Sequence, residues 1–187
     1  MSRATPLIFC LTVLATSAFA DQAHAFSLSG TVWEEASAQT CNVDPKLLYA
    51  VALQESKRYA GGRMVAPNPY ALNISDKGYH PSTRLAAEQL LKEGLANTKH
   101  IAVGAMQVSI RWNGSRVNNP RDLLDLRQNV LIGTQILCEM IAGNEGDLPL
   151  AIGRYHTPNP KLEHIARGYG ENVIKIWRRL ILLGGDA

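Results

Sequence analysis

The sequence lacks several patterns that mark common classes of protein function. Its 187 residues carry 19 Lys and Arg against 16 Asp and Glu, a net charge of only +3, with no basic stripe interleaved with aromatic residues. Such a balance permits weak attraction to an anionic polymer but gives no indication of a nucleic-acid partner. The five histidines show no zinc-ligand spacing, and neither a Gly-rich phosphate loop nor a Gly-x-Ser-x-Gly turn occurs. We therefore expect neither a metal nor a cofactor.

Long hydrophobic runs are also scarce, and the pronounced one is at the N-terminus. Residues 1–3 end in Arg, residues 7–15 are apolar, and residues 18–20 and 23–25 read Ala-Phe-Ala and Ala-His-Ala. This order is typical of a secretory signal peptide, and the apolar run is too short to span a bilayer. An N-terminal core helix would not explain the small residues that follow. We expect a signal peptide over 1–25, cleaved after residue 20 or 25, and a periplasmic protein without stable membrane insertion.

Cysteine is rare as well. Of the three residues, Cys10 lies inside the apolar run, which leaves Cys41 and Cys138 in the mature chain. An even pair in an oxidising compartment predicts a disulfide. Two separate buried thiols are the alternative, because cysteine often packs in protein cores.

The rest of the chain carries many helix signals and few strand signals. Caps and apolar spacing predict helices over about 30–41, 45–57, 83–91, 126–142 and 148–155, a helical region from residue 119, and a helical remainder after Pro160. Residues 61–69 are expected to form a loop, residues 101–110 are apolar and irregular, and the turn at 76–78 predicts a small hairpin within 70–79. The expected fold is mainly α, a single domain over 26–187 with at most a small β-hairpin.

The helix over 45–57 holds the most informative carboxylate. Leu48, Val51 and Glu55 are spaced three and four apart, so they share one face, which is otherwise apolar. A carboxyl at the end of a buried stripe is partly desolvated, which favours its neutral form, and a neutral acid can protonate a glycosidic oxygen. Spacing alone nevertheless favours a helix-end Glu that escapes to solvent.

Three short segments, taken in order, favour a catalytic Glu55 over a solvent-exposed one. They are Glu55-Ser56 after the lead-in Val43-Asp44-Pro45-Lys46-Leu47-Leu48, then Gly104-Ala105-Met106-Gln107-Val108, then Ala151-Ile152-Gly153-Arg154-Tyr155-His156. Together they resemble the Glu-Ser, Gly-Leu-Met-Gln and Ala-Tyr-Asn signatures of lytic transglycosylases with a goose-lysozyme-like catalytic domain. The likeness runs from about residue 31 to residue 177. It implies a lysozyme-like α-rich fold and peptidoglycan glycan strands as substrate.

The resemblance also implies a role for each matching residue. Glu55 would be the catalytic acid and base, and Ser56 would orient the substrate or the Glu55 carboxyl. Met106 and Gln107 would line the cleft, with Gln107 hydrogen-bonding an N-acetyl group or a sugar hydroxyl. Tyr155 would lean its hydroxyl toward Glu55. Core packing is the alternative for Met106 and Tyr155.

The sequence departs from the family pattern at two of these positions. Ala105 replaces the usual Leu, and His156 stands where Asn is usual, which affects the polar contacts expected beyond Tyr155. Trp112 is a candidate sugar-stacking platform, although an isolated Trp is as often part of a core. Residues 69–73 (Pro-Tyr-Ala-Leu-Asn) and 78–79 (Gly-Tyr) resemble the versions attached to conjugation, type IV secretion or pilus assembly.

Two other function classes remain open at this stage. A hydrolytic muramidase needs a second carboxylate, and the best candidate is Asp76, whose place in a Ser-Asp-Lys-Gly turn already explains an Asp without catalysis. A non-catalytic wall-binding or secretion subunit would have no need of Glu55, Gln107 and Tyr155. We therefore expect a lytic transglycosylase.

Overall fold

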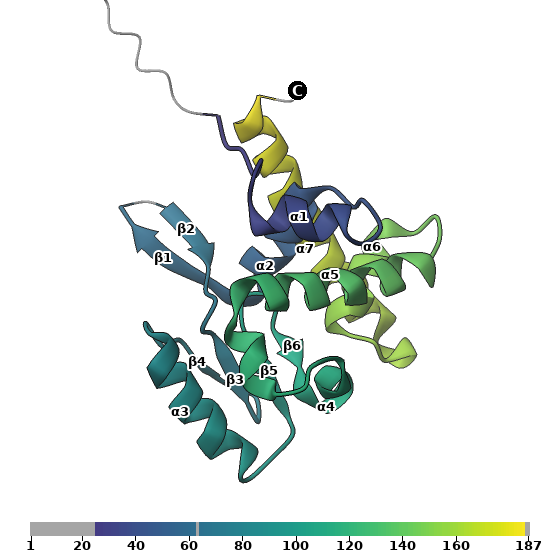
Figure 1. Ribbon diagram of the computed structural model, residues 1–187. Coiled ribbons are helices and arrows are strands. Elements are labelled where there is room, and N and C mark those ends of the chain that lie inside the picture. Colours follow the sequence, from purple (N-terminus) through teal and green to yellow (C-terminus); the bar gives the residue numbers. More distant parts are fainter. Residues whose placement is uncertain (1–24, 63, 186–187) are drawn as a thin grey trace, which may run out of the picture.

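The computed structural model describes residues 25–62 and 64–185, and helices dominate them (Figure 1). The α-helices are α1 (Val32–Ala38), α2 (Pro45–Ser56), α3 (Arg84–Leu95), α4 (Ile110–Asn113), α5 (Leu126–Ala142), α6 (Leu148–His156) and α7 (Glu163–Gly184). The strands are β1 (Lys57–Gly61), β2 (Met64–Pro67), β3 (Leu72–Ile74), β4 (Lys77–Tyr79), β5 (Ile101–Val103) and β6 (Val108–Ser109). The mainly α fold class is thus confirmed.

Side-chain caps explain where four of these helices begin. Asp44, before Pro45, accepts a hydrogen bond from the backbone N–H of Lys46, and Thr83, Asp125 and Asp147 cap α3, α5 and α6 in the same manner. Each cap satisfies a backbone donor that the first helical turn leaves without a partner. Two short 3₁₀ helices, Gly114–Arg116 and Pro120–Leu124, lie between α4 and α5, and a third, Pro160–Leu162, precedes α7.

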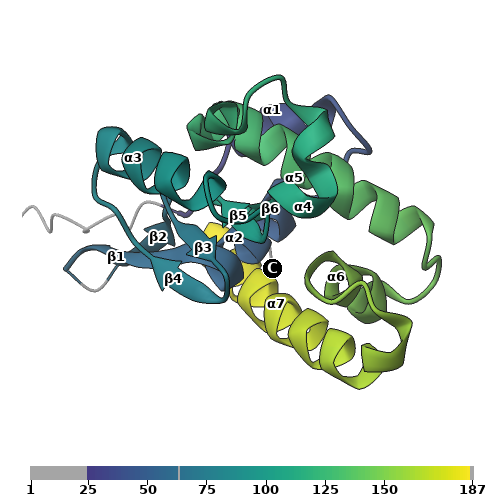
Figure 2. The same ribbon diagram turned by 90° about the horizontal axis from the view of Figure 1, so that it is seen from below.

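The helix α2 lies at the centre of the molecule. Its side chains from Leu47 to Leu53 are almost all buried, and it packs against α7 and α1. The sheet and α3 lie on one side of it, and α6 and α7 lie on the other (Figures 1 and 2). At the α6–α7 crossing, a Cβ on Gly153 would lie 2.0 Å from the Ala166 carbonyl oxygen, so the close approach requires glycine there. A carboxylate near the end of α2 therefore lies between the sheet with α3 on one side and the helices α6 and α7 on the other.

A four-stranded antiparallel sheet extends the predicted hairpin. Its strand order is β4-β3-β5-β6, and Leu72–Ile74 pairs with Tyr79–Lys77 on one side and with Val103–Ile101 on the other. The hairpin within 70–79 is confirmed, whereas residues 101–110, predicted to be irregular, contain β5 and β6. These strands have three and two residues, too few to show a period of two.

The β1–β2 hairpin begins before the segment 61–69, predicted as a loop, and includes most of it. Its two strands pair from Lys57 opposite Pro67 to Gly61 opposite Met64, with an irregularity between Tyr59 and Gly61. Every residue of β1 is exposed, so the segment shows no alternation of buried and exposed side chains that would identify a strand.

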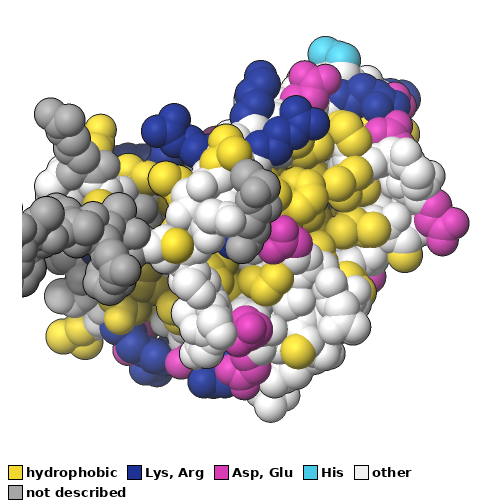
Figure 3. Space-filling model, turned by 90° about the horizontal axis from the view of Figure 1, so that it is seen from above, with side chains coloured by type: hydrophobic (Ala, Val, Ile, Leu, Met, Phe, Trp, Pro, Cys, Tyr) yellow, Lys and Arg dark blue, Asp and Glu magenta, His cyan; other side chains and the backbone are white. Residues whose placement is uncertain are grey.

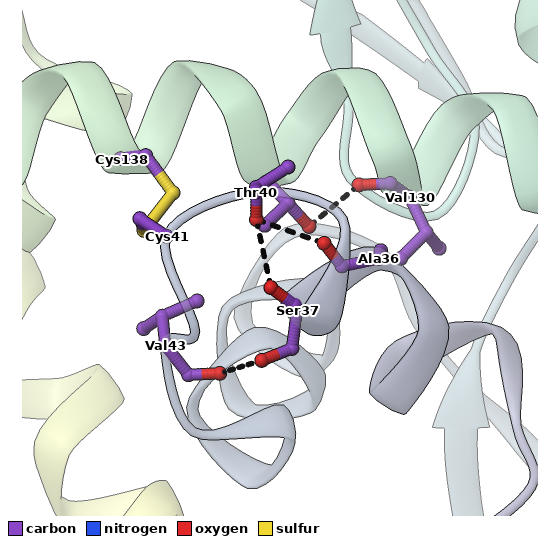
Figure 4. The surroundings of a disulfide bond; sticks show 8 residues. Ala36, Ser37, Thr40, Cys41, Val43, Val130 and Cys138 are labelled. Carbon is purple, nitrogen blue, oxygen red and sulfur yellow. Dashed lines mark hydrogen bonds between the residues drawn. A yellow bond between two sulfur atoms is a disulfide. The ribbon is translucent and has the colours of Figure 1, made fainter.

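The predicted disulfide is present. Cys41, in the loop after α1, is bonded to Cys138 of α5, as Figure 4 shows. The loop is also fixed locally, because the Thr40 hydroxyl donates to the Ala36 carbonyl at 2.8 Å and the Ser37 hydroxyl donates to the Val43 carbonyl. The bond joins the start of the domain to the 17-residue helix α5.

The predicted signal peptide lies almost wholly outside the described residues, which begin at Ala25. Within the described part of the chain, no helix is both long and apolar enough to cross a bilayer.

Candidate active site

Glu55 is the penultimate residue of α2, and its side chain is only 9% exposed. Its Oε1 atom accepts a hydrogen bond from the Tyr169 hydroxyl at 2.6 Å and lies 3.2 Å from Nδ1 of His156. No residue in the described part of the chain hydrogen-bonds the other oxygen, Oε2. One oxygen of the carboxyl is therefore held in place, and the second is available to a ligand.

His156 and Tyr169 form a stacked pair beside this carboxyl, with ring centroids 4.5 Å apart and planes tilted by 4°. Burial, and then the charge of Glu55, raises the pKa of Tyr169 well above its ordinary range, so the phenol stays protonated and donates. The hydrogen bond to Glu55 is the main cause that raises the pKa of His156, and burial acts against it. The His156 side chain is 51% exposed, so solvent screens this pairing.

Tyr155 does not make the contact that the sequence predicts. Its hydroxyl donates to the carbonyl of Met106 at 2.6 Å, and the tyrosine that reaches Glu55 is Tyr169 of α7. Burial, and then the charge of Glu55, raises the pKa of Tyr155 as well, so it also remains a donor. Tyr155 thus ties the end of α6 to the turn between β5 and β6.

That turn, residues 104–107, is held by a buried side chain of α5. The Asn129 carbonyl oxygen accepts from the Met106 N–H at 2.8 Å, and its amide donates to the carbonyls of Val103 at 2.8 Å and Leu123 at 3.0 Å. Gly104 has φ +82°, and a Cβ there would lie 2.3 Å from Asn129 Nδ2, so the position requires glycine. Asn129 therefore fixes the second motif relative to α5.

Gln107, the last residue of the turn, faces the same cavity as Glu55. Its backbone has φ +47°, and its amide nitrogen donates to the carbonyls of Ala71 at 3.1 Å and Gly104 at 2.9 Å. Both amide hydrogens are thereby used, so the side-chain carbonyl oxygen is left as an acceptor. That oxygen suits an N–H or O–H donor, as the predicted contact with an N-acetyl group or sugar hydroxyl requires.

Ser56 and Met106, predicted to contact substrate, lie in the core instead. Their exposed fractions are 2% and 0%, and neither lines the cavity beside Glu55. The Ser56 hydroxyl donates to the Ala105 carbonyl at 2.7 Å and accepts from the Asn68 N–H at 3.1 Å. Burial keeps both side chains away from the cavity surface. Ser56 joins the first motif to the second, and Met106 packs in the core, which is the alternative that the sequence left open for it.

A cavity of about 670 Å³ opens beside Glu55. Gln107, Tyr155 and His156 line it together with Trp112, which is 70% exposed. The Arg111 guanidinium lies 4.9 Å from the centroid of the Trp112 ring and orders the indole. An exposed aromatic ring on the wall of a cavity is a surface on which the apolar face of a sugar can stack.

Glu139 is the other carboxylate among the described residues that line this cavity. It is 51% exposed, and its Oε2 lies 2.7 Å from the Arg116 guanidinium. Asp76, the second carboxylate that the sequence favours, lies in the β3–β4 turn, is 84% exposed and is outside the cavity lining, with His100 at 3.8 Å. Asp76 is therefore poorly placed to act with Glu55.

A second cavity, of about 600 Å³, lies near the disulfide and is mostly apolar. Leu47, Ile141, Leu148 and Trp177 line it, and a band of hydrophobic side chains crosses the face shown in Figure 3. Two carboxylates, Asp44 and the exposed Glu145, also line it. The Asp44 carboxylate is fully engaged, since Oδ2 accepts from the Trp177 indole at 2.6 Å and Oδ1 caps α2.

Tyr169 and Asn129 are the important site residues that the sequence reading missed. Tyr169 belongs to the buried stripe of α7, with Val173 and Leu180, and a tyrosine on such a stripe needs a partner for its hydroxyl. Asn129 is an amide among the buried residues of α5. In both cases a polar residue on an apolar helix face was the available signal.

The described residues contain no group of three His, Cys, Asp or Glu side chains able to hold a metal ion. Comparison with known proteins gives one family. The transglycosylase SLT domain matches residues 32–174, more than half of the chain. Neither the curated proteins nor the solved structures contain a significant match. The chain belongs to the transglycosylase SLT domain family, which indicates lytic transglycosylase activity on peptidoglycan.

Proposed function

We propose that the protein cleaves the β-1,4 bond between N-acetylmuramic acid and N-acetylglucosamine and leaves a 1,6-anhydromuramyl end. The observation that carries this proposal is the state of Glu55. Its carboxyl is almost wholly buried and Oε1 is fixed by Tyr169, while Oε2 has no hydrogen-bond partner among the described residues, on the wall of a sugar-sized cavity.

In the first step, protonated Glu55 gives its proton to the bridging oxygen. The bond between that oxygen and the muramyl anomeric carbon breaks, and N-acetylglucosamine leaves with a new hydroxyl. Positive charge develops on the muramyl ring, and the substrate's own acetamido oxygen stabilises it. Tyr169 holds Glu55 in a single orientation during the transfer.

In the second step, Glu55 acts as a base. Its carboxylate takes the proton of the muramyl 6-hydroxyl, whose oxygen bonds to the anomeric carbon and closes the anhydro ring. Glu55 is protonated again at the end, so no water is consumed and no second carboxylate is required. The Gln107 carbonyl oxygen and the Trp112 ring hold neighbouring sugars.

Hydrolysis is the competing reaction, and it can be judged from the carboxylates that line the cavity. A hydrolase places two carboxyl groups across the scissile bond. On the cavity wall that second group would be Glu139, but its pairing with Arg116 commits it to an exposed ion pair. The covalently tethered 6-hydroxyl is therefore the nucleophile that this site favours.

Mass analysis of the muropeptides released from purified peptidoglycan tests the proposal. Anhydro products, lighter than hydrolysed ones by one water, are expected from the parent protein and from the Glu139→Gln and Asp76→Asn variants. Glu55→Gln should fold normally and lose activity by about 10²–10⁴-fold, because the amide cannot carry the proton. Reducing muramic acid ends, lost in Glu139→Gln, would establish hydrolysis instead.

The wider role follows from the resemblance within 69–79, where β3 and β4 lie. We propose that the exported protein works in the periplasm and opens the wall locally for a secretion, conjugation or pilus apparatus. Deletion of its gene should lower the transfer or assembly rate of that apparatus while bulk growth is unchanged, and complementation with Glu55→Gln should not restore it.

A further inference from the structure

His156 contacts the carboxyl of Glu55 at an oxygen that already has a partner. Its Nδ1 lies 3.2 Å from Oε1, and the Tyr169 hydroxyl donates to the same oxygen at 2.6 Å. The imidazole is held in this orientation by the Tyr169 ring, on which it stacks with centroids 4.5 Å apart and planes tilted by 4°. Two side chains from two helices, α6 and α7, therefore converge on one oxygen of the carboxyl.

The chemistry of this oxygen decides which nitrogen of His156 carries a hydrogen. The Glu55 carboxylate has only acceptor atoms, so an imidazole nitrogen that bonds to it must be a donor. Nδ1 therefore carries a hydrogen in the cationic form of His156, and also in the neutral form that keeps this contact. A carboxylate oxygen has two lone pairs, and Tyr169 and His156 together occupy both of those on Oε1.

The other oxygen of Glu55 is left without such donors. Oε2 has no hydrogen-bond partner among the described residues. The other cationic and acidic side chains on the cavity wall have partners of their own: Arg154 with the Asn159 carbonyl, Glu139 with Arg116 and His100 with Asp76. The two oxygens of Glu55 are thus unequal, and the difference comes from Tyr169 and His156.

We propose that His156 positions the catalytic proton of Glu55 on Oε2. This inference rests on the proposed function, in which Glu55 gives a proton to the bridging oxygen and later takes one from the muramyl 6-hydroxyl. With both lone pairs of Oε1 occupied, the proton is held at Oε2, the oxygen left for a ligand. When that proton leaves, the new carboxylate keeps both hydrogen bonds at Oε1, so no protein donor has to reorganise.

The same arrangement serves the second step. The carboxylate takes the 6-hydroxyl proton at Oε2, because Oε1 remains bonded to Tyr169 and His156. His156 neither gains nor loses a proton over the cycle, so it is a positioning residue that acts through Glu55. A Glu55 protonated on Oε1 would instead donate to Nδ1 of His156 and would have no proton for the substrate.

Kinetics on soluble glycan fragments test this proposal. His156→Leu removes the donor and should lower kcat by about tenfold with little change in KM, a modest effect for a hydrogen bond to a charged group because His156 is 51% exposed. His156→Asn should recover most of that loss, since the amide nitrogen of Asn is a donor bonded to Cγ, as Nδ1 is. His164→Leu is the matched control, because His164 is exposed and outside the cavity lining, and its kcat should equal that of the parent.

The tautomer of His156 gives a second measurement that needs no substitution. Nitrogen-15 NMR of the parent should show neutral His156 with its hydrogen on Nδ1, whereas free histidine carries it mainly on Nε2. A hydrogen on Nε2, or a His156→Leu variant that changes KM and not kcat, would overturn the inference while the proposed function stands. Parent-like activity in Glu55→Gln would overturn the proposed function instead.

Discussion

Tyr169 and His156 reach the same oxygen of Glu55 from different helices, α7 and α6. Tyr169 remains a hydrogen-bond donor, because burial raises the pKa of its phenol and the phenol does not ionise near neutral pH. The hydrogen bond to Glu55 raises the pKa of His156, so His156 keeps its positive charge to a higher pH than an unperturbed histidine does. One partner therefore fixes the position of the carboxyl, and the other couples it to pH.

Removal of the Tyr169 hydroxyl should lower kcat without a comparable change in KM. Tyr169→Phe keeps the ring against His156 and loses the bond to Glu55, and a hydrogen bond to a charged group is worth about ten- to a hundredfold. Tyr155→Phe is the comparison, since it loses a bond to a backbone carbonyl and should chiefly lower the melting temperature. Equal kcat in Tyr169→Phe and the parent would show that the bond does not position Glu55.

His156→Asn should alter the pH dependence of stability. Pairing with Glu55 raises the pKa of His156 above its ordinary 6.5, so the stabilisation is complete below that value and is lost as pH rises through the folded-state pKa. The melting temperature of the parent should exceed that of the variant at pH 6, and the gap should narrow as pH rises above 6.5 and through the raised pKa of His156. A gap that is constant or widens with pH would contradict the pairing. Because the side chain is half exposed, we expect a small gap.

At the scale of elements, the disulfide is the strongest single constraint on the unfolded chain. It joins residues 97 apart, so Cys41→Ser with Cys138→Ser should lower the free energy of unfolding by about 4.7 kcal/mol on the chain-entropy estimate. Urea denaturation of the variant and of the oxidised parent measures the difference. Peptide mapping without reductant should recover the two cysteines joined, and two alkylatable thiols in the native protein would refute the bond.

Helices could be predicted from the sequence because their signals are local. The limits of α5 follow from Asp125, which caps it, and Gly143, which ends it, and both are visible in the sequence. The strands β5 and β6 could not be predicted, because they are very short and β5 is defined by pairing with β3, about thirty residues earlier. The exposed β1 shows no alternation at all.

The site residues, too, divide into those that local sequence signals predict and those that they do not. Glu55 and Gln107 could be found because they belong to short motifs with fixed neighbours. Tyr169 could not, because its partner Glu55 is 114 residues away and only the packing of α7 against α2 brings them together. A residue of a motif need not contact the substrate. Ser56 and Met106 belong to the motifs, but both are buried and pack beneath the site.

At the scale of the whole molecule, the domain's packing begins almost where the predicted signal peptide ends. The backbone N–H of Phe26 donates to the Leu183 carbonyl at 2.9 Å, and its ring lies 5.4 Å from that of Tyr49. Leu28 is buried. Phe26 thus packs against the end of α7, and cleavage after residue 20 or residue 25 would leave both Phe26 and Leu28 in the mature chain.

This arrangement predicts both the mature N-terminus and its effect on stability. Export should yield a protein that begins at Asp21 or Phe26, as N-terminal sequencing of the periplasmic fraction will show, and an intact Met1 there would refute the signal peptide. Chains beginning at Asp21 and at Phe26 should unfold at the same urea concentration, because both keep Phe26 and Leu28. A chain beginning at Ser29 should lose about 3 kcal/mol, since burial of each side chain contributes about 1.5–3 kcal/mol and Phe26 is only half buried. Equal stability of all three chains would show that these residues do not close the domain.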